Sequence, residues 1–225
     1  MTNNLYKTIE QYMLSCAGDS AHDAEHIYRV LYNSLAIAKT ETTVDYDILI
    51  TACLLHDIGR PDQFANPKLC HAQVGADKAK VFLENLGMSP AFIESVCHCI
   101  RTHRFSNRLQ PETLEAKILF DADKLDVTGA LGIARTLEYQ GKHDYPLYTV
   151  IDGHISDGAD DTAPSFFQEY KRKLEKLYDG FYTREGKRLA VSKQTAAETF
   201  YHALYQEITQ GYHAGRETLS SLLEE

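Results

Sequence analysis

The chain has 225 residues and a formal net charge of −9, from 32 acidic and 23 basic side chains. This length predicts one large domain or two small ones, with a core that needs no disulfides. The acidic balance argues against binding to a nucleic-acid backbone, which needs a surplus of Lys and Arg, although a small anionic substrate in a local basic pocket stays compatible with it.

The five cysteines are an odd number, which favours reduced thiols and a cytoplasmic protein. The first residues are polar and amphipathic, so we expect no secretory signal. No apolar run approaches the roughly 18 residues of a membrane span, so no membrane partner is expected. The sequence leaves open whether the protein is a homodimer.

Apolar residues recur at helical spacing along the chain, and strand signals are nearly absent. Asp45 or Thr43 is expected to begin the third helix, and Gly59 with Pro61 to end it. Ser89 is expected to cap a later helix in which Pro90 is the first residue. Residues 60–71 are predicted to form a loop. In chain order, the helices predicted up to residue 140 cover about 3–17, 22–39, 45–59, 72–86, 89–103, 111–125 and 129–139.

Residues 141–165 contain five glycines and prolines together with several aspartates, and they predict a long loop or flap. Helices are expected after it at about 165–180, 190–210 and 212–223. We therefore predict an all-α fold with a helical core over 1–140 and C-terminal helices over 166–225 packed on that core. A separate C-terminal domain is the alternative, but roughly 60 residues are marginal alone.

An apolar run from Ile48 to Leu55 ends abruptly in His56 and Asp57. Such a run predicts a central helix or strand, and polar groups at its end are costly to bury unless they are paired or bind a metal. Adjacent helical residues point about 100° apart, so both aim at one ion only near a helix end or a distortion. A capping His-Asp pair is the alternative interpretation.

Six of the ten histidines lie between residues 22 and 103, and histidine is a common metal ligand and acid–base residue. His22, His26 and Arg29 are spaced i, i+4 and i+7, so they share one face of a helix. This face presents His26 beside a base and a cation. The alternative is an ordinary solvated polar face.

Three aspartates, Asp121, Asp123 and Asp126, lie in a segment whose other residues look buried. Asp123 lies beside the apolar face of the helix, where a carboxylate needs a partner such as a metal. An acidic helix end with three solvated aspartates is the alternative. With His26, His56 and Asp57, Asp123 makes a set of nitrogen and oxygen ligands that suits Mn²⁺, Fe²⁺, Zn²⁺, Ni²⁺ or Co²⁺.

The pattern His26, His56-Asp57 and Asp123 resembles the HD superfamily of metal-dependent phosphohydrolases. Three segments of the sequence are similar to motifs of a small bacterial branch of this superfamily, which resembles nucleotide pyrophosphohydrolases. These segments are His22-Asp23-x-x-His26-x-x-Arg29-Val30, Leu54-Leu55-His56-Asp57-Ile58 and Asp121-Ala122-Asp123-Lys124-Leu125-Asp126. The resemblance runs from about residue 20 to 210. It implies an HD-domain helical bundle with a C-terminal helical extension.

The resemblance implies that His26, His56, Asp57 and Asp123 hold one divalent ion, with Mn²⁺ favoured and Fe²⁺, Ni²⁺, Co²⁺, Zn²⁺ or Mg²⁺ as alternatives. Asp123 is chosen over Asp121 because the family's last aspartate lies in an Ala-Asp-x-Leu context. The implied reaction is hydrolysis of (deoxy)nucleoside triphosphates to monophosphate and pyrophosphate. Three alternatives stay open: a nucleoside 5′-monophosphate phosphatase, a cyclic-nucleotide phosphodiesterase and a non-catalytic nucleotide-binding module.

Several superfamily members carry a glutamate a few residues after the His-Asp pair, whereas this chain has Arg60 there and Asp62 one turn on. This departure weakens the monophosphatase interpretation. The proton relay is left open among three residues: Asp126, His22 and Asp62.

His71 and His103 lie where binuclear superfamily members carry extra ligands. The favoured interpretation is that both bind substrate phosphate or support the ligands, because the resembling branch looks mononuclear. Among the basic side chains, Arg29 and Arg104 each lie within one turn of a site histidine and are expected to bind phosphate, with Lys124 as a further candidate. Solvated surface charge is the default for each.

Overall fold

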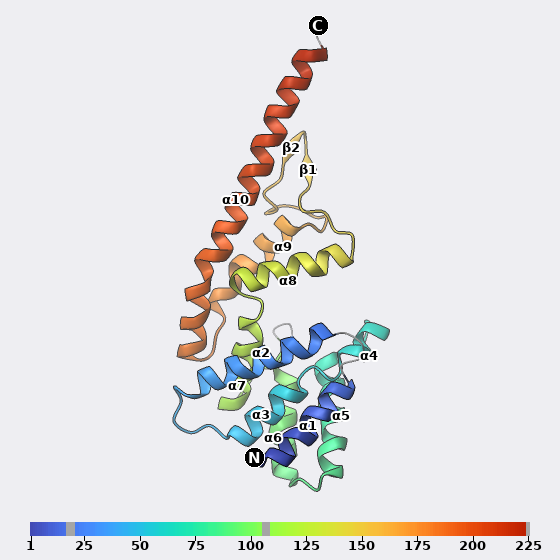
Figure 1. Ribbon diagram of the computed structural model, residues 1–225, viewed down its shortest axis with the longest axis vertical. Helices are drawn as coiled ribbons and strands as arrows, with labels where there is room; N and C mark the ends of the chain where they lie inside the picture. The colour runs from blue at the N-terminus through green and yellow to red at the C-terminus, as the bar shows by residue number, and fades with distance from the viewer. Residues whose placement is uncertain (17–20, 105–108, 224–225) are drawn as a thin grey trace. The chain divides into compact units, whose positions relative to one another are not determined.

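The computed structural model describes residues 1–16, 21–104 and 109–223, without the side chains of 21–23. It confirms the all-α prediction, because helices dominate and the described strands are two short ones (Figure 1). Contacts group the chain into two units: residues 1–126 with 181–187, and residues 127–180 with 188–225. Packing of the C-terminal helices on the core stays a prediction.

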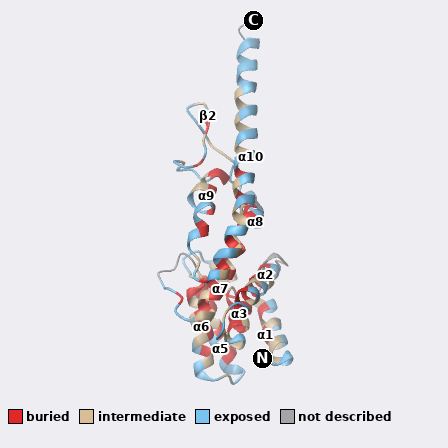
Figure 2. Cartoon of the chain, turned by 90° about the vertical axis from the view of Figure 1, so that its left-hand side faces the viewer, coloured by how far each residue is buried: buried red, intermediate tan, exposed pale blue. Residues whose placement is uncertain are grey.

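The first unit is built around α3 (Tyr46–Leu55), whose residues from Thr51 to Leu55 are all buried (Figure 2). Burial on most sides is what the apolar run predicts for a central element. The helices that pack on α3 include α1 (Asn3–Cys16), α2 (Ala21–Ala38), α5 (His71–Asn85), α6 (Pro90–Thr102) and α7 (Leu114–Leu125).

Polar side chains begin these helices where the sequence predicts them. Asp45 accepts hydrogen bonds from the backbone N–H groups of Asp47 and Ile48 at the start of α3. Ser89 accepts one from the N–H of Phe92 at the start of α6. Each cap satisfies backbone donors that the first turn of a helix leaves unpaired.

The predicted loop over 60–71 is wrong in its first half, because residues 60–65 form a short helix, α4 (Arg60–Ala65). Pro61 lies in the first turn, where a proline is tolerated because its missing N–H has no helical partner. The loop prediction takes this proline only as the end of the preceding helix, whereas a proline also begins helices.

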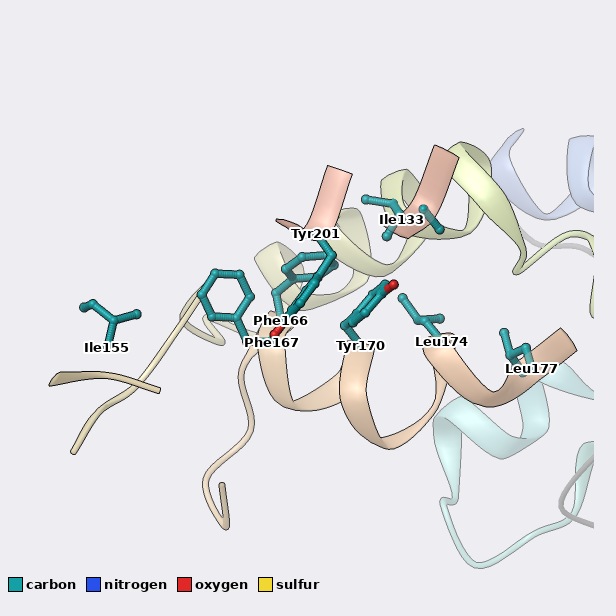
Figure 3. Close-up of a cluster of buried hydrophobic side chains, with 9 residues drawn as sticks. Ile133, Ile155, Phe166, Phe167, Tyr170, Leu174, Leu177 and Tyr201 are labelled. Atoms are coloured by element: carbon teal, nitrogen blue, oxygen red, sulfur yellow. The ribbon is translucent and has the colours of Figure 1, made fainter. Parts of the chain in front are cut away.

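The second unit contains α8 (Gly129–Lys142), the strands β1 (Val150–Ile151) and β2 (His154–Ile155), α9 (Phe166–Arg172), the 3₁₀ helix η1 (Leu174–Asp179) and α10 (Arg184–Leu223) from Arg188 onward. Its core is an aromatic cluster in which the rings of Tyr170 and Tyr201 stack with centroids 4.1 Å apart (Figure 3). Phe166 and Phe167 are buried beside them.

Two sequence expectations for this unit are corrected by the structure. The predicted loop over 141–165 contains an antiparallel hairpin, in which Val150 pairs with Ile155. The predicted break near Gly211 is absent, because α10 is continuous. A glycine inside a helix costs about 1 kcal/mol, and packing of Ile208 and Tyr212 on the buried cluster offsets it. None of the described helices has the length and apolar composition that crossing a bilayer needs.

Candidate metal centre

His56 and Asp57 follow the last residue of α3, where the chain leaves the helical path. The backbone N–H of Arg60 donates to the carbonyl oxygen of Asp57, which turns the chain into α4. Both side chains lie at the buried end of the central helix: His56 is fully buried, and the side chain of Asp57 is 9% exposed. This helix end lets two consecutive residues face the same region.

Three side chains from three helices meet at this point. Ligand atoms of His26 on α2, His56 after α3 and Asp123 on α7 all lie within 4.8 Å of one another. The Nε2 atom of His26 is 3.4 Å from Nε2 of His56 and 3.3 Å from Oδ1 of Asp123. Oδ2 of Asp57 lies 3.6 Å from Nε2 of His26 and 3.7 Å from Nε2 of His56. These four residues form the first group.

A second group uses the other oxygen of the same aspartate. Oδ1 of Asp57 lies 3.5 Å from Nε2 of His71 and 3.5 Å from Nε2 of His103. The two Nε2 atoms are 3.3 Å apart, so these three residues also bring their ligand atoms close enough to hold an ion. Asp57 therefore faces both groups, and the predicted residues His71 and His103 lie beside the predicted ligands.

Every one of the four imidazoles has its Nδ1 atom bound to an oxygen. His56 Nδ1 lies 2.7 Å from the carbonyl oxygen of Cys53, and His103 Nδ1 lies 2.6 Å from that of Ile100. His26 and His71 use side-chain oxygens, Asp126 Oδ2 at 2.7 Å and Gln63 Oε1 at 2.8 Å. Since carbonyl and carboxylate oxygens only accept, each Nδ1 carries a proton, and the neutral form of each ring turns a lone pair on Nε2 toward the cluster.

In each of the two groups, the pKa of one imidazole is lowered and that of the other is raised. Burial lowers the pKa of His56 to about 4 and that of His71 to about 3. Burial also disfavours charge on His26 and His103, but hydrogen bonds to aspartates outweigh it and raise the pKa of both, that of His26 well above its ordinary value. A proton on His26 or His103 thus supplies positive charge among the carboxylates.

These observations fit a divalent cation. Ligands about 2.1 Å from an ion lie roughly 3.0–3.4 Å apart, close to the 3.3–4.0 Å that separates the facing atoms of His26, His56 and Asp123. Among the described residues, the buried Oδ1 of Asp57 has no hydrogen-bond partner. Nitrogen lone pairs, carboxylate oxygens and an unsatisfied buried oxygen together make a site that attracts a positive ion.

Further site residues that the sequence predicts and the structure describes lie outside the two groups, each with partners of its own. Asp126 is fully buried and accepts hydrogen bonds from both His26 and Arg29. Asp62 is partly exposed and forms an ion pair with Lys78. The ammonium of Lys124 lies over the rings of Phe120 and Phe181, at 5.8 and 4.9 Å from their centroids. The side chain of His22 lies outside the part of the chain that the structure describes.

Two residues that the sequence did not predict as part of the site contact the cluster. Arg60 Nε donates to Oδ2 of Asp57 at 3.0 Å, and the charge of Arg60 helps to hold the pKa of Asp57 well below its usual range. Gln63 accepts from His71. The spacing in the sequence indicates both contacts, since Arg60 follows Asp57 by three residues and Gln63 follows Arg60 by three on α4. The loop predicted over 60–71 has no such periodicity, so it gives neither residue a place at the site.

The glycine of the His56-Asp57-Ile58-Gly59 stretch allows α5 to approach. A Cβ on Gly59 would lie 2.3 Å from the carbonyl oxygen of His71 and 2.7 Å from the N atom of Gly75. We expect Gly59→Ala to lower the free energy of unfolding by about 1–3 kcal/mol, because α5 must move away. Urea denaturation measures the change, with Gly141→Ala as the control, since a Cβ there meets no atom within 4 Å. Equal stability of Gly59→Ala and wild type would contradict this packing.

Cys70, which precedes α5, is the thiol that the structure activates. Burial opposes its ionisation, but backbone N–H groups of Gln73 and Ala72 and the side chain of Arg104 outweigh it and lower the pKa. Burial raises the pKa of Cys53 and Cys99 to about 12.

We therefore expect iodoacetamide at pH 7 to label Cys70 at least about tenfold faster than these buried thiols, as read by peptide mass spectrometry. Arg104→Ala should slow the labelling of Cys70. Faster labelling of Cys53 than of Cys70 would contradict the assignment.

Residues 23–128 match the family model described as the HD domain. The curated protein YpgQ of Bacillus subtilis (strain 168), named as uncharacterized, is 28% identical over 193 residues, which are 84% of this chain and 85% of that protein.

Solved structures resemble the chain over most of its length. The crystal structure of Bacillus subtilis YpgQ in complex with ADP has a TM-score of 0.70 at 26% identity and covers 90% of this chain and 97% of that one. An HD-superfamily hydrolase from Bacillus thuringiensis has a TM-score of 0.69 at 26% identity and covers 91% of this chain and 96% of that one. The matched region contains all six residues of the two groups.

Proposed function

We propose that the chain is a metal-dependent phosphohydrolase that cleaves (deoxy)nucleoside triphosphates to nucleoside monophosphate and pyrophosphate, because residues 23–128 match the HD domain and similar solved structures include HD-superfamily hydrolases. One observation carries the proposal: four imidazole Nε2 atoms and two carboxylates from separate helices converge at the end of α3. Building such a cluster for packing alone would leave buried donors and acceptors poorly satisfied.

We assign His26, His56, Asp57 and Asp123 as ligands of one divalent ion, with Mn²⁺ as the first candidate. When bound, such an ion supplies Lewis-acid polarisation of a phosphate group and activation of water. We assign His71 and His103 to the phosphates of the substrate. Metal analysis tests this division: one ion per chain supports it, and two ions would make His71 and His103 ligands of the second.

The nucleotide part of the proposal is supported by a relative. YpgQ has been crystallised in complex with ADP, and its chain matches this one over most of both lengths. In this chain, Arg60 is partly exposed beside Asp57, where its charge offsets charge that develops on a phosphate during reaction. Arg104 lies near Cys70, at 3.8 Å from Sγ, and we propose it as a second phosphate contact.

A proton acceptor must also be reachable from the reacting water. Of the two predicted relays whose side chains the structure describes, Asp62 is accessible, at 34% exposure beside Lys78, whereas Asp126 is fully buried and bound to His26 and Arg29. We therefore favour Asp62 as the general base.

The test is incubation of the purified protein with Mn²⁺ and each nucleoside triphosphate or monophosphate, with products separated by anion-exchange chromatography. Pyrophosphate and monophosphate from a triphosphate support the proposal. Orthophosphate from monophosphates would overturn it in favour of a nucleotidase. No turnover of either class would leave cyclic nucleotides or a non-catalytic nucleotide-binding role.

A further inference from the structure

A buried carboxylate connects the cluster to a basic side chain on α2. Asp126, which follows the last residue of α7, is 0% exposed. The Oδ2 atom of Asp126 lies 2.7 Å from Nδ1 of His26. The guanidinium group of Arg29 donates to both carboxylate oxygens of Asp126, from Nε to Oδ1 at 2.7 Å and from Nη2 to Oδ2 at 3.0 Å. His26 and Arg29 come from one face of α2, about 100 residues earlier in the chain.

Only one arrangement of protons satisfies the hydrogen bonds among Arg29, Asp126 and His26. Arginine only donates, so both oxygens of Asp126 must accept from Arg29. With Oδ2 also next to His26, the proton of the neutral imidazole belongs on Nδ1. Its lone pair then lies on Nε2, the atom that faces His56 and Asp123. A carboxylate that fixes the tautomer of a histidine in this way raises the strength of the opposite nitrogen as a ligand.

We propose that Arg29 and Asp126 are positioning residues that hold His26 in the tautomer and orientation required for metal binding, and that Arg29 acts through Asp126. The proposal rests on the proposed metal-dependent function. It gives Arg29 a role different from the phosphate contact expected from the sequence, and it gives Asp126 a role different from the proton relay.

The identity of Asp126 is decisive because an amide cannot replace it. Asparagine has one accepting oxygen, whereas Asp126 receives three N–H groups on two oxygens. If the amide oxygen in the Asp126→Asn variant faces Arg29, the NH₂ group of the same amide faces Nδ1 of His26. The imidazole then accepts at Nδ1 and carries its proton on Nε2, where it blocks the cation.

The experiment measures Mn²⁺ affinity in the absence of nucleotide, from the electron paramagnetic resonance signal of free Mn²⁺. We expect Asp126→Asn and Arg29→Gln each to weaken Mn²⁺ binding by about 10- to 100-fold. Arg29→Lys keeps the charge but loses the fork, so it should fall between Arg29→Gln and wild type. Asp77→Asn, the same chemical change at an exposed position of α5, should bind Mn²⁺ like wild type.

Thermal unfolding of the metal-free variants separates positioning from general damage. Weaker Mn²⁺ binding with a melting temperature like that of wild type supports the proposal, and the Arg29 variants carry the test if Asp126→Asn does not fold. Wild-type Mn²⁺ affinity in Arg29→Gln, with only a raised KM for nucleotide, would overturn it and restore the phosphate role. Because the readout needs no substrate, Mn²⁺ binding without triphosphate hydrolysis would overturn the proposed reaction while leaving this inference standing. Failure of the wild type to bind Mn²⁺ would overturn both.

Discussion

Replacing Asp57 with alanine is expected to abolish triphosphate hydrolysis and to reduce Mn²⁺ binding by more than the roughly 100-fold that marks the upper end for outer-shell residues. Both oxygens of Asp57 face histidines: Oδ2 faces His26 and His56, and Oδ1 faces His71 and His103. Removing the side chain therefore takes a donor from both groups at once.

The effect should be specific to this carboxylate. Asp57→Asn keeps the size of the side chain and one accepting oxygen, so it separates charge from shape, and we expect it to lose most of the metal affinity as well. Asp77→Ala is the control for removal of an exposed aspartate. Metal content by mass spectrometry, Mn²⁺ affinity and turnover are measured on the same preparations, after circular dichroism has shown the helical fold. Full activity in Asp57→Ala would refute the ligand assignment.

Replacing Asp121 with alanine is expected to have the opposite pattern, with a large loss of stability and little loss of metal affinity per folded molecule. Asp121 is fully buried on α7 and accepts from the backbone N–H groups of Tyr182 and Thr183 and from the hydroxyl of Thr183, at 2.6–2.9 Å. It thereby satisfies donors in the segment from which α10 begins. Its oxygen also lies near Gly186, where an added Cβ would approach it to 2.6 Å.

Truncation leaves these donors without their acceptor in a buried site. Each unsatisfied group costs about 1–3 kcal/mol, so we expect the free energy of unfolding to fall by about 3 kcal/mol or more. Urea denaturation measures the loss, and Thr183→Val, which removes the hydroxyl donor and leaves the two backbone N–H groups paired, should lose less. A change below about 1 kcal/mol in Asp121→Ala would show that solvent or other groups replace the carboxylate.

The two aspartates show where sequence reasoning ends. Asp121 and Asp123 lie two residues apart in the same acidic segment and differ in sequence only by their neighbours. The family resemblance chose Asp123, and the structure brings Asp123 to His26 while Asp121 turns to Thr183. Two residues on a helix point about 200° apart, so one faces the cluster and the other faces the opposite side. What lies on each side is a property of the packed helices.

The sequence by itself determined the helical class, the buried central helix with a His-Asp pair at its end, the cap at Ser89, and a start of the central helix at Asp45 or Thr43. It also predicted His26 and Asp123 as partners of that pair. These features depend on local periodicity, capping chemistry and motif spacing, which short stretches of chain carry. Only the tertiary structure decided that Arg29 binds Asp126, that Arg60 contacts Asp57 and that His71 and His103 share the oxygen of that aspartate. A buried charged group pairs with whichever donor the packing brings within about 3 Å, because an unpaired one is costly to bury, and for Arg29 and Asp126 that donor lies 97 residues away in the chain.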